Sequence, residues 1–278
     1  MSPTVGRLIE DAARNLAASA DLAEARREAQ ILLGHAMGVS RARLSAHRDE
    51  AADPAVAEPF HALVRRRQAG EPVAYLVGRR EFYGLEFRVT PDVLIPRADT
   101  ETLVDVALEK LREGTQPDVL DLGAGSGCIG IAIAHERPAA RVTATDISET
   151  ALKVARDNAV AIGVDVELVR GAWFEPLAGR RFDLIVSNPP YVAIGDQHLQ
   201  QGDLRFEPAI ALVSGMDGLA DIRIIVAHAP GYLREGGWLL FEHGCDQADV
   251  CRDLLRDTGF GEVVSRADIA GLPRVAGG

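Results

Sequence analysis

The sequence predicts an α/β protein in which a doubly wound, mostly parallel sheet follows a small N-terminal helical domain and a β-hairpin. From residue 118 onward, short apolar runs typical of buried strands alternate with segments of helical periodicity, which is the pattern of βαβ units. Residues 1–70 show only the helical spacing of apolar side chains. We therefore expect a helical bundle at 1–70, a linker containing the hairpin at 71–90, and the sheet domain at 91–278.

The helical domain is expected to hold four short helices. Apolar residues recur at helical spacing from Val5 to Leu16. Further helices are expected to begin near Asp21, Ser40 and Asp53, because Asp and Ser are favoured helix N-caps. No cluster of residues in this domain points to a chemical reaction.

The linker changes character, with two short aromatic and β-branched runs on either side of Gly84. Such a pattern predicts a hairpin. A helix is then expected from about Asp99 to Glu113. The expected strands beyond it are 119–122, 141–145, 165–169, 182–187, 237–242 and 260–265, and the expected helices are 127–134, 149–162, 217–233 and 246–257. Residues 192 to about 213 form a long loop with little periodicity.

The charge distribution narrows the function classes. Residues 1–90 carry 13 Arg and 12 acidic residues, whereas residues 91–278 carry 17 basic and 29 acidic residues. An acidic sheet domain is a poor match for a phosphate backbone, so we expect no direct nucleic-acid binding. The sequence shows neither an apolar run of membrane-spanning length nor a secretory signal. We expect a cytoplasmic monomer without a metal site.

A glycine-rich loop marks a candidate cofactor site. Gly123, Gly125 and Gly127 directly follow an expected strand and precede a helix, with Ala124 and Ser126 between them. This context lets the backbone pass close to a nucleotide-like ligand. Asp146 ends the next strand, where a carboxylate can accept both ribose hydroxyl protons. A dinucleotide and S-adenosylmethionine both remain possible ligands at this point, although the charge of Asp121 before the loop favours a cationic ligand.

A second candidate site follows the strand 182–187, in the sequence Asn188-Pro189-Pro190-Tyr191. Neither proline can extend a sheet ladder or enter a helix interior, and a residue that precedes proline is pushed toward extended conformations. This stiff corner leaves the Asn188 side chain, the Pro189 carbonyl and the Tyr191 ring available. Two acceptors beside an aromatic face suit a planar group that carries an NH2, such as a carboxamide or the exocyclic amine of a base.

The two sites together resemble those of class I S-adenosylmethionine-dependent methyltransferases that act on amino nitrogens. Other segments resemble one family within that class, the peptide-chain release factor N5-glutamine methyltransferases (PrmC, also called HemK). The segments that carry this resemblance are 71–78, 81–84, Ile95-Pro-Arg-Ala-Asp-Thr-Glu101, Asp121-Leu-Gly-Ala-Gly-Ser-Gly127, Trp173-Phe174, Ser187–Tyr191, Phe206-Glu-Pro208 and Ser214-Gly-Met-Asp-Gly218.

The resemblance implies a Rossmann-like methyltransferase domain, and a helical domain that recognises the substrate protein. It implies methyl transfer to the side-chain nitrogen of the glutamine in the Gly-Gly-Gln motif of class-1 release factors, which are the expected partners. The implied contacts to S-adenosylmethionine are Gly123, Ala124, Gly125, Ser126, Gly127, Asp146, Trp173 and Asn188. The implied substrate contacts are Asn188, Pro189, Pro190 and Tyr191, of which Asn188, Pro189 and Tyr191 are the expected catalytic residues.

One position departs from the family pattern, which often has Gly-Asp before the Trp-Phe pair where this chain has Gly171-Ala172. Trp173 or backbone groups would then have to hold the adenine amine. The residues also allow an adenine-N6 methyltransferase that acts on DNA or RNA, with Tyr191 stacked on a flipped base. They are compatible as well with a non-catalytic cofactor-binding module and with a nicotinamide-dependent oxidoreductase.

Overall fold

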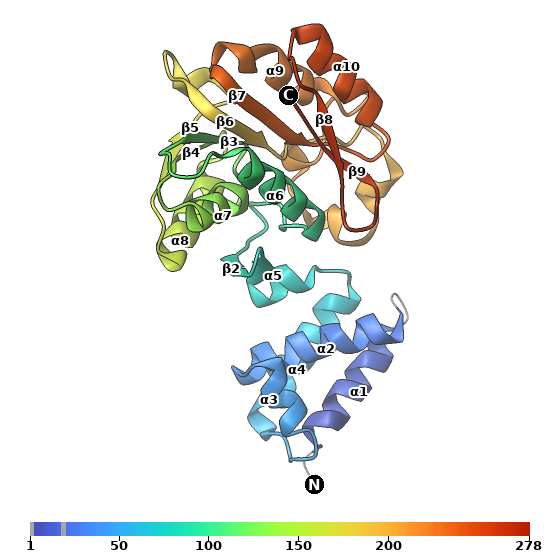
Figure 1. Ribbon diagram of the computed structural model, residues 1–278. Coiled ribbons are helices and arrows are strands. Elements are labelled where there is room, and N and C mark those ends of the chain that lie inside the picture. The colour runs from blue at the N-terminus through green and yellow to red at the C-terminus, as the bar shows by residue number, and fades with distance from the viewer. Residues whose placement is uncertain (1–2, 18–20) are drawn as a thin grey trace. The chain divides into compact units, whose positions relative to one another are not determined.

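The chain folds as two compact units in the computed structural model, which describes residues 3–17 and 21–278 (Figure 1). One unit is the chain up to Gly78 together with Gln200–Phe206, and the other comprises Arg79–Leu199 and Glu207–Gly278. The hairpin of the expected linker thus belongs to the sheet unit. A short stretch of the long loop belongs to the helical unit, and no periodicity or composition in the sequence indicated this.

The described part of the helical unit is built from short helices whose apolar faces meet in one core. These helices are α1 (Val5–Leu16), α2 (Leu22–Met37), α3 (Arg41–Ala46), α4 (Pro54–Gln68) and α5 (Val73–Val77). The expected helix starts are confirmed, because the side chains of Asp21, Ser40 and Asp53 each accept a backbone N–H of the first turn. Thr4 does the same for α1. Helix α5 was not expected.

The stretch Gln200–Phe206 is attached to the helical unit through Arg67 of α4. The Arg67 Nε donates to Glu28 of α2 at 2.9 Å, and its Nη1 donates to Asp203 at 2.9 Å. The Arg67 and Glu28 side chains are only 19% and 13% exposed. Little water screens their attraction, so this ion pair is stronger than one on an open surface.

The expected hairpin is confirmed as strands β1 (Arg79–Phe82) and β2 (Leu85–Arg88), which pair antiparallel. Its turn residues Tyr83 and Gly84 both have positive φ, at +52° and +70°, as a two-residue turn matching the strand twist requires. The Tyr83 N–H donates to Glu101 at 2.8 Å and its hydroxyl donates to Asp105 at 2.7 Å. These two bonds hold a non-glycine residue in the left-handed region.

The second unit contains a seven-stranded sheet in the order β5-β4-β3-β6-β7-β9-β8. The strands are β3 (Asp118–Leu122), β4 (Arg141–Asp146), β5 (Val166–Arg170), β6 (Phe182–Ser187), β7 (Leu233–Glu242), β8 (Val264–Ala267) and β9 (Pro273–Gly277). Strands β3 to β7 are parallel, whereas β9 is antiparallel to both neighbours. The predicted doubly wound, mostly parallel sheet is confirmed.

The C-terminal end of the sheet differs from the prediction. The last expected strand, 260–265, begins only at Val264, and β9 was missed altogether. Proline opens β9 and residues 268–272 separate it from β8, so the segment lacks the length and alternation that make a strand recognisable from sequence. In the structure β9 pairs with both β7 and β8.

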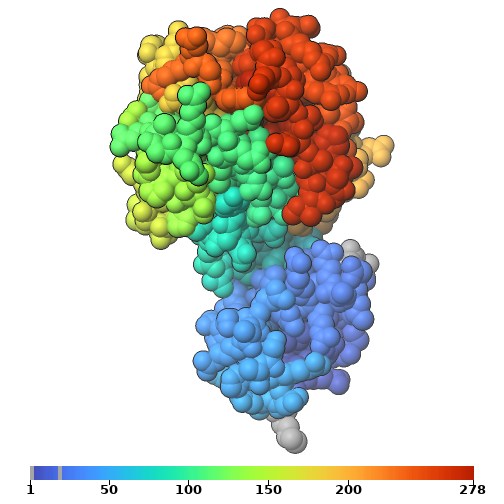
Figure 2. Space-filling view, viewed as in Figure 1, coloured from blue at the N-terminus to red at the C-terminus, as the bar shows by residue number. Residues whose placement is uncertain are grey.

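Helices cover both faces of the sheet (Figure 1). They are α6 (Glu101–Lys110), α7 (Cys128–Glu136), α8 (Glu149–Ile162), α9 (Ala220–His228) and α10 (Ala248–Thr258). One core joins α6, α7 and α8 to the sheet, and another joins α9 and α10 to it. Atoms of α6 and of the β8–β9 hairpin meet on the face shown in Figure 2. Arg266 of β8 pairs with Glu109 of α6. Within the described ranges, no helix is long and apolar enough to cross a membrane.

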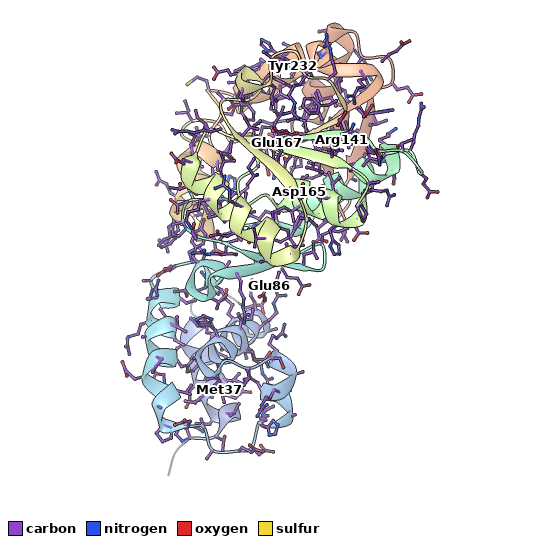
Figure 3. All side chains as sticks on the ribbon, turned by 90° about the vertical axis from the view of Figure 1, so that its left-hand side faces the viewer. Met37, Glu86, Arg141, Asp165, Glu167 and Tyr232 are labelled. Atoms are coloured by element: carbon purple, nitrogen blue, oxygen red, sulfur yellow. The ribbon has the colours of Figure 1, made fainter. Side chains whose placement is uncertain are left out.

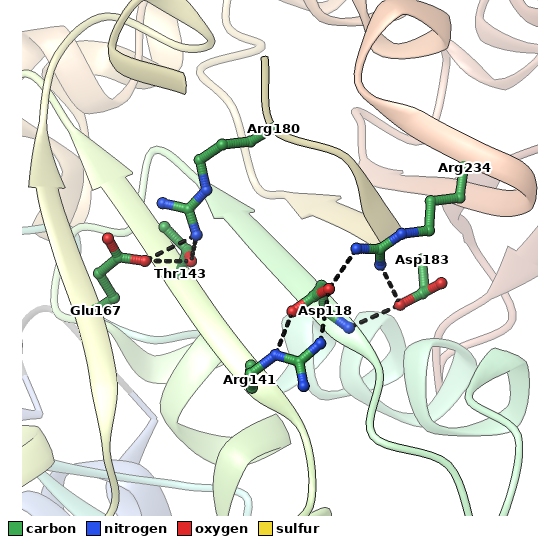
Figure 4. A network of polar contacts seen from close by, with 7 residues as sticks. All are labelled: Asp118, Arg141, Thr143, Glu167, Arg180, Asp183 and Arg234. Atoms are coloured by element: carbon green, nitrogen blue, oxygen red, sulfur yellow. Dashed lines mark hydrogen bonds and ion pairs between the residues drawn. The ribbon is translucent and has the colours of Figure 1, made fainter. Parts of the chain in front are cut away.

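The amino ends of the strands carry a network of charged side chains. Arg141 at the start of β4 and Glu167 on neighbouring β5 both lie near this end of the sheet (Figure 3). Asp118 accepts from Arg141 Nε at 2.6 Å, and its own backbone N–H donates to Asp183 at 2.7 Å (Figure 4). Arg234 of β7 binds both Asp118 and Asp183. The network therefore ties β3, β4, β6 and β7 together at the amino edge.

The network makes the stability of the sheet unit depend on the ionisation of Asp118. Hydrogen bonding from Arg141 holds the pKa of Asp118 below its usual range. A depressed pKa in the folded state stabilises above the ordinary value of about 4, and this contribution disappears as the pH falls through the folded-state pKa. We expect Asp118→Asn to lower the free energy of unfolding at pH 7 by about 1 kcal/mol, discounted for the exposed arginines.

Urea unfolding of both proteins from pH 7 down to pH 3 measures this difference, which should shrink below about pH 4. Asp165→Asn is the matched control, since Asp165 is an exposed carboxylate at the same edge. A difference that stayed constant over the whole range would contradict this role of Asp118.

Candidate active site

A cavity of about 250 Å³ opens at the carboxyl ends of the parallel strands. Every residue that lines it belongs to the sheet unit. Ligands of doubly wound folds bind at this edge, where the chain order in the sheet reverses. The expected site residues that line the cavity are Gly123, Ala124, Gly125, Ser126, Asp146, Trp173, Asn188 and Pro190.

The glycine loop follows β3 and forms one wall. Its three glycines, Gly123, Gly125 and Gly127, have φ of +73°, +54° and +81°, which L side chains rarely adopt. No atom lies within 4 Å of a Cβ built on Gly125, so its backbone is open to a ligand. Gly127 does not line the cavity, and a Cβ there would lie 2.8 Å from Ile131 Cδ1. In this structure the absence of a side chain at Gly127 lets the loop pack closely against Ile131 of α7 and Ala155 of α8.

Asp146 at the end of β4 faces the cavity with a fixed carboxylate. Its Oδ2 accepts the Gly125 N–H and its Oδ1 accepts the Ser148 N–H, both at 2.8 Å. Each carboxylate oxygen retains a lone pair that can accept a further proton. The carboxylate can therefore accept hydrogen bonds from two neighbouring hydroxyl groups. Its bond to the Gly125 N–H joins it to the loop that lines the cavity.

Trp173 lies beside the glycine loop with a φ of +48°. Its backbone carbonyl accepts the Thr145 hydroxyl at 3.3 Å. A Cβ on Gly123 would come within 3.2 Å of the Trp173 ring, so the indole packs directly on the loop. Ala172 also lines the cavity. At this position the chain presents an apolar methyl group where the related pattern often has a carboxylate.

Asp121 at the base of the loop is a buried acid with one unsatisfied oxygen. Its Oδ2 accepts the Gly130 N–H at 2.9 Å, while Oδ1 has no partner among the described residues. Burial raises the pKa of Asp121 to about 7. A cationic group bound near the loop would favour the ionised form and offset the cost of burying it.

The Asn188-Pro189-Pro190-Tyr191 corner begins where β6 ends. The buried Ser187 hydroxyl donates to the Leu122 carbonyl at 2.8 Å and so fixes the end of β6 to the end of β3. Asn188 lines the cavity, and its Nδ2 donates to Thr100 Oγ1 at 3.2 Å. Across the described ranges, neither Asn188 Oδ1 nor the Pro189 carbonyl accepts a hydrogen bond. These are the two acceptors that the sequence suggested.

Pro189 and Tyr191 do not line the cavity, although they flank residues that do. Pro189 is buried, and the Tyr191 hydroxyl donates to Glu242 Oε1 at 3.0 Å. Burial and the neighbouring Glu242 carboxylate raise the pKa of Tyr191. The phenol therefore stays protonated, and its hydrogen bond to Glu242 holds this end of the corner in place.

Sequence reasoning missed the groups that support this corner. Glu242 is 1% exposed at the end of β7, and it accepts a hydrogen bond from Thr100 Oγ1 at 2.6 Å. Glu242 ends the expected strand that follows 182–187 in the chain. Consecutive strands of a parallel sheet are often neighbours, so the sequence could have indicated that this acid lies beside the corner. Thr100 lies in the segment Ile95–Glu101 that carried the family resemblance. Nothing in that segment indicated that its hydroxyl would contact Asn188 or Glu242.

The outer wall of the cavity is formed by residues 92–97 and by part of the long loop, residues 208–213. Glu207 joins the two segments, because its fully buried carboxylate accepts the Ile95 N–H at 3.1 Å and pairs with Arg97. The long loop is thus fixed on the sheet unit at Glu207.

Comparison with known proteins agrees with this geometry. Residues 98–209, which include the glycine loop and the Asn-Pro-Pro-Tyr corner, match the family model of the methyltransferase small domain. The second unit is therefore a Rossmann-like methyltransferase domain. Residues 7–78 match the model of the PrmC N-terminal domain.

Curated relatives match over nearly the whole chain. The release factor glutamine methyltransferase of Bordetella pertussis is 52% identical over 254 residues, covering 91% of this chain and 94% of that protein. The release factor glutamine methyltransferase of Xylella fastidiosa is 52% identical over 252 residues, covering 90% and 92%. The chain belongs to the family of release factor glutamine methyltransferases, as the sequence motifs predicted.

Among solved structures, the hMettl16 catalytic domain in complex with MAT2A 3′UTR hairpin 1 superposes with a TM-score of 0.55. The two chains are 16% identical, and the match covers 84% of this chain and 83% of the other. At this identity the likeness concerns the fold alone, which agrees with the predicted α/β class.

Gly218 offers a test of how closely the corner is packed. Its φ is +75°, and a Cβ there would lie 2.2 Å from the Tyr191 carbonyl oxygen. Gly218→Ala should lower the free energy of unfolding by about 2–5 kcal/mol, the sum of left-handed strain and overpacking. It should also lower the methyl-transfer rate, because the Tyr191 backbone must move. Gly163→Ala is the matched control, with a φ of +82° and no atom within 4 Å of the added Cβ.

Gly163→Ala should cost only the strain of about 1–2 kcal/mol and leave the turnover unchanged. Denaturant unfolding and a methyl-transfer assay on both variants decide the matter. Equal losses of stability, with turnover unaffected in both, would show that the contact to Tyr191 does not constrain the corner.

Proposed function

We propose that this protein transfers a methyl group from S-adenosylmethionine to the side-chain amide nitrogen (N5) of the glutamine in the Gly-Gly-Gln motif of class-1 peptide chain release factors. The observation that carries the proposal is the 52% identity to a release factor glutamine methyltransferase across 94% of that protein. The substrate motif follows from the family resemblance.

The cavity residues fit S-adenosylmethionine, which when bound supplies an electrophilic methyl group on a positively charged sulfur. The Asp146 carboxylate is held by two backbone N–H groups and suits the ribose hydroxyls. The loop of Gly123, Ala124, Gly125 and Ser126 allows close backbone approach. In this proposal Trp173 packs near the adenine, and the acid Asp121 favours a cationic ligand over a phosphate.

The corner residues would hold the substrate glutamine. An amide nitrogen is a weak nucleophile because its lone pair is delocalised, and its pKa lies far above that of any side chain that could deprotonate it. Instead, Asn188 Oδ1 and the Pro189 carbonyl would each accept one hydrogen of the NH2 group. These bonds strengthen as the nitrogen becomes positive, so they favour the transition state over the ground state.

Orientation supplies much of the remaining acceleration. Holding the nitrogen in line with the methyl group contributes ~7–11 kcal/mol in favourable cases. Pro190 and the Tyr191 ring are assigned to the walls that keep the amide plane fixed and exclude water. The proton is lost to solvent after methyl transfer, so the mechanism needs neither a metal nor a covalent intermediate.

We assign the helical unit, residues 1–70 and the segments packed with it, to recognition of the release factor. The acidic residues 91–278 suit a protein with basic surface and disfavour direct nucleic-acid binding. We infer that the enzyme works as a monomer in the cytoplasm, where release factors act. A different substrate, an adenine in DNA or RNA, has no observation in its favour beyond the shared corner motif.

The substrate assignment is tested by incubating the protein with labelled S-adenosylmethionine and a class-1 release factor, and in parallel with adenine-containing DNA and RNA oligonucleotides. We expect one methyl group on the glutamine of the Gly-Gly-Gln motif, located by peptide mass spectrometry, and none on the oligonucleotides. Methylation of an oligonucleotide instead of the release factor would overturn the assignment.

Asn188→Ala tests the role of the corner. This variant removes the side-chain acceptor, so methyl transfer should fall by at least ~100-fold, on the scale of losing one transition-state hydrogen bond. Binding of S-adenosylhomocysteine, measured by calorimetry, should weaken far less. Gln116→Ala, which removes an exposed side-chain amide at the amino edge of the sheet, is the control. A near-normal rate for Asn188→Ala would reject the mechanism.

A further inference from the structure

Four side chains from three separate segments form a continuous hydrogen-bonded chain at the corner. Asn188 Nδ2 donates to Thr100 Oγ1 at 3.2 Å, and Thr100 Oγ1 donates to Glu242 Oε2 at 2.6 Å. Glu242 Oε1 accepts the Tyr191 hydroxyl at 3.0 Å. Thr100 and Glu242 are 2% and 1% exposed. Both ends of the corner, Asn188 and Tyr191, are thereby connected to one buried carboxylate.

The chain has a defined direction because its members differ in what they can donate. Thr100 Oγ1 has a single hydroxyl proton and donates it to Glu242, which in its ionised form only accepts. Thr100 Oγ1 is then left with lone pairs alone, and the group that faces it must be a donor. Only the NH2 end of the Asn188 amide satisfies this requirement. The Oδ1 end must therefore face away from Thr100.

We propose that Thr100 and Glu242 are positioning residues for methyl transfer, which set the orientation of the Asn188 amide so that Oδ1 faces the substrate. This inference rests on the proposed function, in which Asn188 Oδ1 accepts a hydrogen of the substrate amide. Without the chain, the two orientations of an asparagine amide are close in shape and differ only in their hydrogen bonds. A reversed Asn188 would turn its own NH2 toward the NH2 of the glutamine.

The burial of Glu242 makes this arrangement of hydrogen bonds hard to reverse. A buried carboxylate that loses one of its donors keeps one oxygen without a partner in a low-dielectric site, which is costly. Reversing the Thr100 hydroxyl would remove such a donor, so the chain resists reversal. Burial raises the pKa of Glu242, while the hydrogen bonds from Thr100 and Tyr191 and the charge of Arg274 oppose this rise.

Thr100→Val is the direct test, because valine keeps the shape of threonine and removes the hydroxyl. We expect kcat to fall at least about tenfold, with the affinity for S-adenosylhomocysteine changed less than about threefold. Thr100→Ser restores the hydroxyl and should recover most of the lost turnover. Thr258→Val is the matched control, since among the described residues the Thr258 hydroxyl bonds only to a carbonyl of its own helix α10.

A double-mutant cycle separates positioning from a general structural effect. If Thr100 acts through Asn188, adding Thr100→Val to Asn188→Ala should reduce the rate no further than Asn188→Ala alone. Multiplicative losses in the double variant would overturn the inference. So would a normal kcat in Thr100→Val.

Glu242→Gln gives a second route should Thr100→Val fold poorly. Glutamine keeps the volume but adds a donor, which allows the Thr100 hydroxyl to turn toward Asn188. We expect a loss of kcat that again disappears in the Asn188→Ala background, and a loss that persists there would contradict the inference. An inactive wild type on release factors would instead refute the proposed function, so the two failures are distinguishable.

Discussion

The order of the strands is the constraint on which the site depends. The chain enters the sheet at β3, places β4 and β5 on one side, and places β6 and β7 on the other. Because these strands are parallel, their carboxyl ends lie at one edge. That edge brings together the glycine loop after β3, Asp146 at the end of β4, Asn188 after β6 and Glu242 at the end of β7. No local segment of the chain contains more than one of these groups.

The two edges of the sheet use polar groups in opposite ways. At the amino edge, Asp118 and Asp183 are matched by Arg141 and Arg234, so the charges there are satisfied internally (Figure 4). At the carboxyl edge, Asp121 keeps one oxygen without a partner among the described residues. Asn188, which does line the cavity, likewise has an Oδ1 that accepts no bond from the described residues, and a ligand can complete such a group.

Local sequence signals predicted those parts of the site whose chemistry is contained in a short segment. The glycine loop, Asp146 and Asn188 each have a signature of spacing or of neighbouring residues, and the structure places all three around one cavity. The bond between Thr100 and Glu242 joins residues 142 positions apart. The sequence around neither residue indicates the other as its partner, so only the folded chain could pair them. Strand β9 escaped prediction for a related reason, since its neighbours rather than its own short sequence make it a strand.

A structure of the complex with S-adenosylhomocysteine and a Gly-Gly-Gln-containing release factor tests the central claim most directly. The distances to measure are those from the glutamine side-chain nitrogen to Asn188 Oδ1 and to the Pro189 carbonyl. Our account predicts that both lie within hydrogen-bonding range, about 2.7–3.2 Å, with the Asn188 NH2 still on Thr100. A glutamine amide bound elsewhere, or an Asn188 side chain that turns Oδ1 toward Thr100, would contradict it.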